Sequence, residues 1–121
     1  MQHSPRFLAL IDAIRPTIKE ITAHDLSTQL ATGSTWLLLD VREASEYACG
    51  HIPQAISLSK GVLERDIEAL APDPLTEIVV YCSGGFRSAL AAHNLQAMGY
   101  QRVRSLSLGS RNWQALGLRW E

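Results

Sequence analysis

Two short apolar runs constrain the fold of this chain of 121 residues more than any other feature. One covers residues 36–39 and ends at Asp40, and the other covers residues 77–81 and ends at Cys82. Because the runs are almost continuously apolar, both faces of each strand must be buried, as in the centre of a parallel sheet. We therefore expect an α/β fold.

Helical patterns separate these strands. The sequence predicts helices over residues 23–32, 43–48, 62–70, 88–98 and 110–116, and further strands over residues 55–58 and 103–106. No repeat, low-complexity tract or linker divides the chain, and 46% hydrophobic and 19% charged residues are typical of one globular domain. Strands that alternate with helices favour a parallel sheet covered on both faces.

The first residues form a segment of their own. Ser4 and Pro5 are typical of a helix start, and Pro16 disfavours helix at Arg15, so we expect an amphipathic helix over residues 5–14. Its apolar side chains are spaced to pack on the main body of the protein. The alternative is a helix that docks on a partner or a membrane surface.

Charge and cysteine content exclude several function classes. The net charge of −1 gives no general attraction to nucleic acid or to an anionic membrane, and no apolar run reaches a membrane-spanning length. Cys49 and Cys82 do not form a disulfide framework, and ligands at metal-binding spacing are absent, so we expect neither metal nor cofactor. The default interpretation is a soluble protein of a reducing cytoplasm.

The loop after the second run carries the residues best suited to chemistry. Ligands bind beyond the carboxyl ends of strands in open α/β sheets, and Cys82 occupies that position. Gly84 and Gly85 let backbone N–H groups turn inward as an anion-binding nest, the next helix adds its positive end, and Arg87 adds a cation. These features favour the thiolate, and so Cys–S–X chemistry with X as sulfur, phosphate or arsenate. The alternative is an inert, buried cysteine.

Several ordered motifs make this chain similar to one known family, from about Ile18 to the C-terminus. The sequence resembles the rhodanese (sulfurtransferase) domain in Asp40-Val-Arg-Glu43, Glu46-Tyr47, Gly50-His-Ile-Pro53, Tyr81-Cys-x-x-Gly85-x-Arg87-Ser88, Gly99-Tyr100, Gly109 and Trp113. The resemblance implies a three-layer α/β/α domain around a five-stranded parallel sheet. Residues 18–121 would form this domain, with residues 1–17 as an N-terminal extension outside it.

The resemblance also implies a function and a site. Cys82 would accept a sulfane sulfur, hold it as a persulfide and pass it to a nucleophilic acceptor such as cyanide or a thiol. Arg87 would orient the anionic donor, and the donor would bind along the loop that contains Ser83, Gly84, Gly85, Phe86 and Ser88. The donor would be thiosulfate, a polysulfide or a persulfide, and the acceptor a protein or a low-molecular-weight thiol.

Four residues are expected to support the site structurally: Asp40, Arg42, His51 and Trp113. For three of them an alternative stays open, since Arg42 could contact substrate, His51 could act as a base, and Trp113 could be plain core rather than a pocket wall. Phe86 is expected to form a partner-docking surface or a lid.

The length of the cysteine loop separates sulfur from phosphorus chemistry. Cys82 and Arg87 bound a C-x4-R loop, whereas cysteine phosphatases of this fold use C-x5-R, whose wider cup wraps a tetrahedral phosphate. Sulfur transfer is therefore favoured over a phosphatase or arsenate reductase. A non-catalytic or sulfur-relay module of the same fold is the other alternative.

Two departures from the family pattern bear on the donor. Thiosulfate-specialised members often carry basic residues where this chain has Ser83 and Gly84, and some have arginine where Glu46 stands. We therefore expect thiosulfate to be a poor donor. Two further interpretations concern Cys49, as a small filler residue or a resolving thiol, and Arg102 with Arg104, which we place on a solvated sheet edge.

Overall fold

The computed structural model describes residues 2–33 and 35–121. Its five strands form one parallel sheet in the order β1-β5-β4-β2-β3. The strands are β1 (Lys19–Ile21), β2 (Leu37–Asp40), β3 (Ile56–Ser57), β4 (Glu77–Tyr81) and β5 (Arg102–Leu106). The α-helices are α1 (Pro5–Ile14), α2 (Ala23–Ala31), α3 (Ala44–Ala48), α4 (Lys60–Leu70), α5 (Phe86–Ala97) and α6 (Gly109–Ala115).

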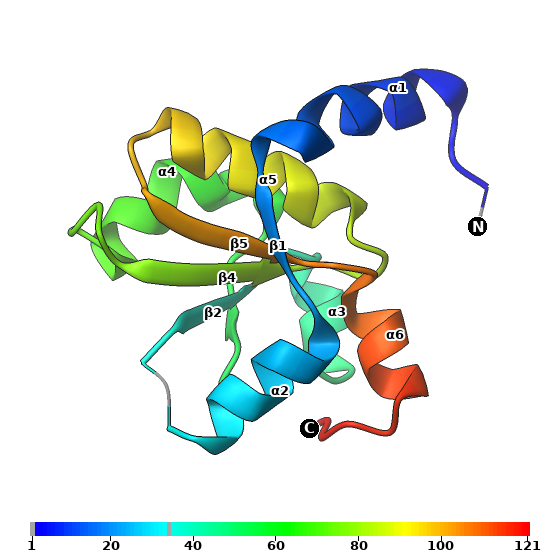
Figure 1. Ribbon diagram of the computed structural model, residues 1–121, viewed down its shortest axis with the longest axis vertical. Helices are drawn as coiled ribbons and strands as arrows, with labels where there is room; N and C mark the ends of the chain where they lie inside the picture. Colours follow the sequence, from blue (N-terminus) through cyan, green and yellow to red (C-terminus); the bar gives the residue numbers. More distant parts are fainter. Residues whose placement is uncertain (1, 34) are drawn as a thin grey trace.

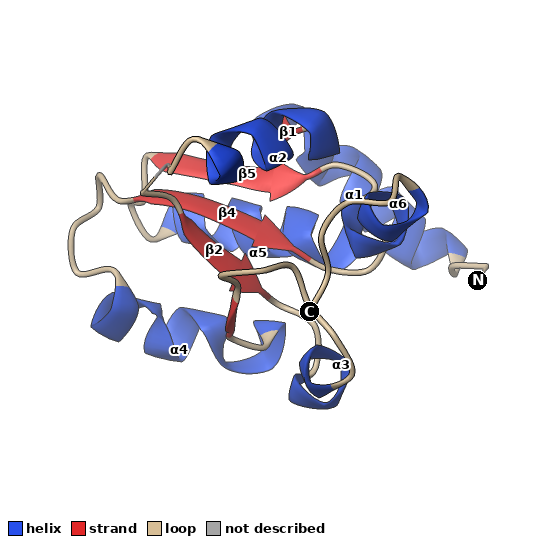
Figure 2. Ribbon diagram, turned by 90° about the horizontal axis from the view of Figure 1, so that it is seen from below, coloured by secondary structure: helices blue, strands red, loops and turns tan. Residues whose placement is uncertain are grey.

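Helices cover both faces of the sheet, which confirms the expected three-layer α/β/α architecture (Figures 1 and 2). One core cluster joins α4 and α5 to one face and contains Leu63, Ile67 and Leu95 together with Cys82. The other joins α2 and α6 to the opposite face through Leu26 and Trp113. Burial of apolar surface on both sides of the sheet is the main stabilising contribution.

The two apolar runs form the neighbouring central strands β2 and β4, as predicted. The sequence pattern did not predict strand β1, although the family resemblance implied a fifth strand. Lys19 and Glu20 are exposed and Ile21 alone is buried, so three residues carry no alternation that a sequence pattern could reveal. Strand β1 is defined by its pairing with β5.

The placement of Arg102 and Arg104 on a sheet edge is wrong. Strand β5 pairs with β1 on one side and β4 on the other, so it is an interior strand. Arg102 lies at its exposed start beside Glu77, and the Arg104 guanidinium lies 5.2 Å from the ring centroid of Trp36. The alternating arginines therefore reflect the solvent-exposed beginning of a central strand.

The N-terminal helix α1 has the predicted bounds and is followed by a 3-10 turn over Arg15–Thr17 that contains the expected breaker, Pro16. Ile11 and Ile14 are buried, and α1 packs against α5, beside which it runs in Figure 1. Helix α5 begins at Phe86, two residues before the predicted start, because Gly85 serves as its N-cap. The cysteine loop is correspondingly shorter than expected.

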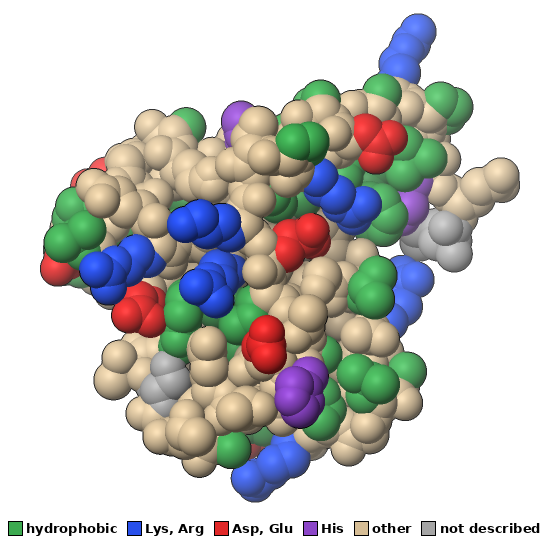
Figure 3. All heavy atoms as spheres, viewed as in Figure 1, with side chains coloured by type: hydrophobic (Ala, Val, Ile, Leu, Met, Phe, Trp, Pro, Cys, Tyr) green, Lys and Arg blue, Asp and Glu red, His purple; other side chains and the backbone are tan. Residues whose placement is uncertain are grey.

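The surface mixes charges of both signs. On the face shown in Figure 3, basic side chains lie near acidic ones, and hydrophobic side chains gather around a histidine over α1. None of the helices in the described ranges is long and apolar enough to cross a membrane.

Candidate active site

Strand β4 delivers Cys82 to the carboxyl edge of the sheet, where its side chain is 1% exposed. The sulfur accepts backbone N–H groups from Gly85 at 3.2 Å and from Ser88 at 3.4 Å. The thiol also lies 3.6 Å from Ser88 Oγ, to which the buried Ser105 hydroxyl donates at 2.8 Å. Two N–H donors at the start of a helix favour negative charge on this sulfur.

The turn of the loop depends on Gly85 rather than on both glycines. Gly85 adopts φ +90°, in the left-handed region that disfavours side chains, whereas Gly84 is outside that region. A Cβ at Gly84 would meet the Phe86 ring at 3.3 Å. The predicted inward turn of the backbone is therefore present, and a single residue makes it.

Helix α6 holds the loop from the other side. Ser110 N donates to the carbonyl of Cys82 at 2.9 Å, and Arg111 N donates to that of Ser83 at 3.1 Å. Gly109, with φ +66°, packs so closely that an added Cβ would overlap the Ser83 carbonyl. The sequence offered Gly109 only as part of the family pattern, without a reason for it.

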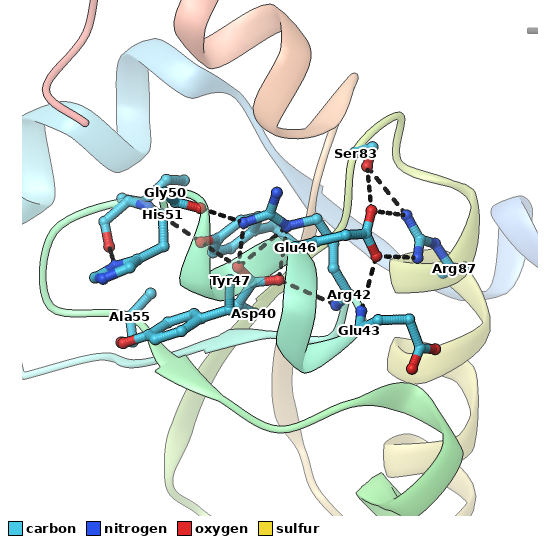
Figure 4. Close-up of polar contacts among 12 residues, drawn as sticks. Asp40, Arg42, Glu43, Glu46, Tyr47, Gly50, His51, Ala55, Ser83 and Arg87 are labelled. Atoms are coloured by element: carbon cyan, nitrogen blue, oxygen red, sulfur yellow. Dashed lines mark hydrogen bonds and ion pairs between the residues drawn. The ribbon is translucent and has the colours of Figure 1, made fainter. Parts of the chain in front are cut away.

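Arg87, which the sequence predicts to be a cation of the site, is paired with Glu46 and Ser83. Its Nη1 donates to Glu46 Oε2 at 3.0 Å, and its Nη2 donates to Ser83 Oγ at 3.0 Å (Figure 4). Hydrogen bonding to Arg87 holds the pKa of Glu46 below its ordinary value. Burial lowers the pKa of Arg87, but the carboxylate of Glu46 raises that pKa by more. The pKa of Arg87 therefore lies above its ordinary value. The two charges compensate each other.

The loop opens into a cavity of about 400 Å3. Its lining includes Cys82 and its neighbours in the loop, Glu46, and the exposed Arg111. Two aromatic residues from the N-terminal segment, His3 and Phe7, complete the lining. The predicted extension is therefore part of the candidate site, which no sequence motif indicated.

Phe86 is half-buried against this segment. Its ring centroid lies 4.3 Å from that of His3 and 5.9 Å from that of Phe7, and the Arg15 guanidinium lies 5.2 Å from it. The ring thus faces α1 across the cavity mouth instead of projecting alone into solvent.

Asp40 and Arg42 form a buried ion pair beside the loop. Arg42 Nη2 donates to Asp40 Oδ2 at 2.6 Å and to the Gly50 carbonyl at 2.8 Å (Figure 4). The Tyr81 hydroxyl donates to Asp40 Oδ2 at 2.8 Å and accepts from Ile52 N. Burial lowers the pKa of Arg42, but its hydrogen bond and attraction to Asp40 raise that pKa by more, so it lies above its ordinary value. The pKa of Tyr81 is raised, first by burial and then by the negative charge of Asp40. This network ties the carboxyl ends of β2 and β4 to the segment between α3 and β3.

Removal of the Asp40 carboxylate should destabilise the protein strongly. Asp40→Ala leaves the Arg42 guanidinium buried without its partner, which costs about 3–5 kcal/mol in similar pairs. The free energy of unfolding, measured by urea denaturation, should fall by that amount. Asp66→Ala breaks an exposed pair with Arg65 and is the control, with a much smaller expected loss. Equal losses in the two variants would contradict a structural role for the buried pair.

The other predicted support residues lie away from the cavity. His51 stacks on Tyr47 with 4.0 Å between ring centroids, and its Nδ1 lies 2.9 Å from the Ile52 carbonyl. Trp113 is buried in the core, and its indole N–H donates to the Arg119 carbonyl at 2.8 Å. Cys49 is exposed at the end of α3. Neither His51 nor Trp113 nor Cys49 lines the cavity. Within residues 2–33 and 35–121, His, Cys, Asp and Glu form no group suited to a metal.

Comparisons with known proteins identify the family of this chain. The model of the rhodanese-like domain matches residues 22–116. A sulfurtransferase from Allochromatium vinosum is 35% identical over 101 residues, which cover 84% of this chain and 92% of that protein.

Solved structures are similar as well. A protein of unknown function from Rhodopseudomonas palustris, described as a possible tyrosine phosphatase, superposes with a TM-score of 0.86 and 31% identity over 100% of this chain and 98% of its own. A thiosulfate sulfurtransferase from Pseudomonas aeruginosa gives a TM-score of 0.83 and 29% identity over 93% of this chain, which spans 21% of that longer protein. The chain belongs to the rhodanese-like family of sulfurtransferases.

Proposed function

We propose that this protein transfers a sulfane sulfur through a persulfide on Cys82. The observation that supports it most is that Cys82 lines a cavity while its Sγ accepts N–H groups from Gly85 and Ser88. These N–H donors can stabilise the negative charge of the Cys82 thiolate before the sulfur is transferred. After the transfer they can stabilise negative charge on the persulfide.

The reaction requires two displacements at sulfur. In the first, the Cys82 thiolate attacks the sulfane sulfur of the donor, an Sγ–S bond forms, and the donor's own bond to that sulfur breaks. The leaving group departs with the electron pair, as sulfite, sulfinate or a thiolate. In the second, cyanide or an acceptor thiolate attacks the outer sulfur, and the Sγ–S bond breaks to return the Cys82 thiolate.

The loop residues take distinct roles in this proposal. Gly85 makes the turn that directs backbone N–H groups at sulfur, and Ser88 adds its N–H and a hydroxyl held by Ser105. Ser83 and Arg87 line the cavity as a hydrogen-bonded unit with Glu46. Arg87 therefore positions the wall of the site and offers little net charge to a donor.

Phosphatase chemistry is less well supported. Cleavage of a phosphate ester needs a general acid to protonate the leaving group, and the carboxylate that lines the cavity is Glu46. Both of its oxygens are engaged by Arg87, which keeps it ionised. The C-x4-R loop also lacks one residue relative to the phosphatase loop.

Charge compensation disfavours thiosulfate as the donor. Glu46 and Arg87 cancel each other, which leaves Arg111 as the uncompensated cation among the described lining residues. Once Cys82 is the attacking thiolate, its charge offsets that of Arg111, so the described lining offers no surplus positive charge to a dianion and suits a monoanion better. A persulfide or polysulfide donor and a protein or low-molecular-weight thiol acceptor fit this charge.

Replacement of Glu46 by glutamine should improve the use of thiosulfate. Glu46→Gln removes the charge that neutralises Arg87, while an amide at the same position keeps the helix-capping hydrogen bond to Glu43 N. The KM for thiosulfate should fall by about tenfold, as expected for one charged hydrogen bond gained. Glu68→Gln on α4 changes net charge equally away from the cavity and should leave KM as it is. An unaltered KM in Glu46→Gln would contradict this account of the donor.

One assay tests the proposed function against its alternative. Purified protein is supplied with a sulfane sulfur donor and cyanide, and thiocyanate is measured; the same protein is supplied with p-nitrophenyl phosphate, and nitrophenolate is measured. We expect thiocyanate and no nitrophenolate. Hydrolysis of the phosphate ester without thiocyanate would refute sulfur transfer.

A further inference from the structure

One part of the cavity lining, here called the aromatic wall, consists of His3, Phe7 and Phe86 and comes from two distant parts of the chain. Phe86 belongs to the start of α5, whereas His3 and Phe7 belong to the N-terminal segment. The ring centroids of His3 and Phe7 are 5.3 Å apart, and each lies within 6 Å of Phe86. All three rings are half-buried and line the same cavity as Cys82.

Helix α1 is fixed in this position by its own packing. Ile11 is 0% and Ile14 7% exposed, so the helix buries its apolar face against the protein body. The guanidinium of Arg15 lies over the Phe86 ring and joins the end of α1 to the start of α5. The aromatic wall is therefore preorganised, and binding need not order it.

The position of this wall in the chain is informative. The rhodanese-like match begins at residue 22, so His3 and Phe7 lie ahead of the part that defines the family. The family loop contains Cys82, and the segment ahead of the family match supplies two of the three aromatic rings that line the cavity.

We propose that His3, Phe7 and Phe86 form a subsite for the organic group of the sulfur donor. The donor class is a monoanion in which an aromatic or bulky apolar group carries the sulfane sulfur. Its ring would stack in the aromatic wall while the sulfur reaches Cys82, and the compensated Glu46–Arg87 pair would accept a single negative charge more readily than two. This inference rests on the proposed function.

Two thiosulfonates that differ only in their organic group provide the test. Benzenethiosulfonate and methanethiosulfonate are both monoanions, and each would transfer its outer sulfur to the Cys82 thiolate with a sulfinate as the leaving group. The measured quantity is the ratio of kcat/KM for the two donors, from thiocyanate formation. We expect Phe7→Ala to lower the ratio of kcat/KM for benzenethiosulfonate to kcat/KM for methanethiosulfonate by about tenfold relative to wild type.

Two further variants keep the test decisive. His3→Ala changes a residue ahead of α1 and keeps the buried contacts of Ile11 and Ile14, and it should lower the ratio in the same direction. Leu10→Ala truncates a side chain of α1 that is 48% exposed and does not line the cavity, and it should keep the wild-type ratio.

The outcomes separate the two claims. Equal loss of kcat/KM for both donors in Phe7→Ala, or an unaltered ratio in both aromatic variants, would overturn the subsite while leaving sulfur transfer intact. If the wild-type protein transferred sulfur from neither of the two thiosulfonates, the proposed function would be refuted, and with it the subsite.

Discussion

Cys82→Ser should abolish sulfur transfer and leave the fold intact. The hydroxyl is close in size to the thiol and can accept the N–H groups of Gly85 and Ser88, but it cannot hold a transferable sulfur. Loss of a nucleophile reduces kcat by orders of magnitude, so thiocyanate formation should fall by at least about 10³-fold. Thermal unfolding followed by circular dichroism should give a melting curve close to that of wild type.

Cys49→Ser is the matched control for this variant. Cys49 is exposed at the end of α3 and lies outside the cavity lining, so its replacement should keep wild-type activity. Retention of most activity in Cys82→Ser would contradict the proposed mechanism. Loss of activity in Cys49→Ser would revive the alternative in which this second thiol resolves the persulfide.

Gly109→Ala should produce the second largest loss of activity, through the backbone of the cysteine loop. An alanine Cβ would overlap the Ser83 carbonyl and lie 2.7 Å from that of Cys82, and neither backbone group can move without moving the loop. Displacement of a reacting group by about 1 Å costs about 10²-fold in rate, and we expect kcat/KM to fall by that factor. The free energy of unfolding should fall by about 2–4 kcal/mol, since overpacking adds to the strain of positive φ.

Gly117→Ala isolates the contribution of the contact. Gly117 has φ +72°, close to the φ +66° of Gly109, but open space surrounds the position of its Cβ. This variant carries a similar backbone strain, of about 1–2 kcal/mol, and should keep wild-type activity. If both variants lost activity equally, backbone strain alone would explain the result, and the support of the loop by α6 would be refuted.

Patterns local in sequence predicted much of the fold. The central strands β2 and β4 are buried on both faces, and their composition alone indicates it. Helix α1 has the predicted bounds because Pro5 and Pro16 act within one turn of its ends. Strand β1 has no such pattern, because a three-residue segment with one buried side chain is defined by its neighbour in the sheet.

The candidate site divides in the same way. Cys82, Gly85 and Ser88 lie in one short stretch of the chain that covers the cysteine loop and the first turn of α5, so the sequence could predict that they lie close together. The Glu46–Arg87 pair joins residues 41 positions apart, and Phe7 meets Phe86 across an even longer separation. No periodicity encodes these contacts, since they depend on how α3 and α1 pack beside α5. The charge of the site and the shape of its aromatic wall therefore depend on how the helices pack and are not visible in local sequence patterns.

The central claim is most directly tested by mass spectrometry of the reduced protein after incubation with a sulfane sulfur donor. Intact mass should increase by one sulfur atom, cyanide should remove it, and peptide mapping should place it on Cys82. Benzenethiosulfonate should give higher occupancy than thiosulfate at equal concentration. A Cys82 that stays unmodified after treatment with each of the two donors, or a sulfur atom found on Cys49 instead, would contradict the account.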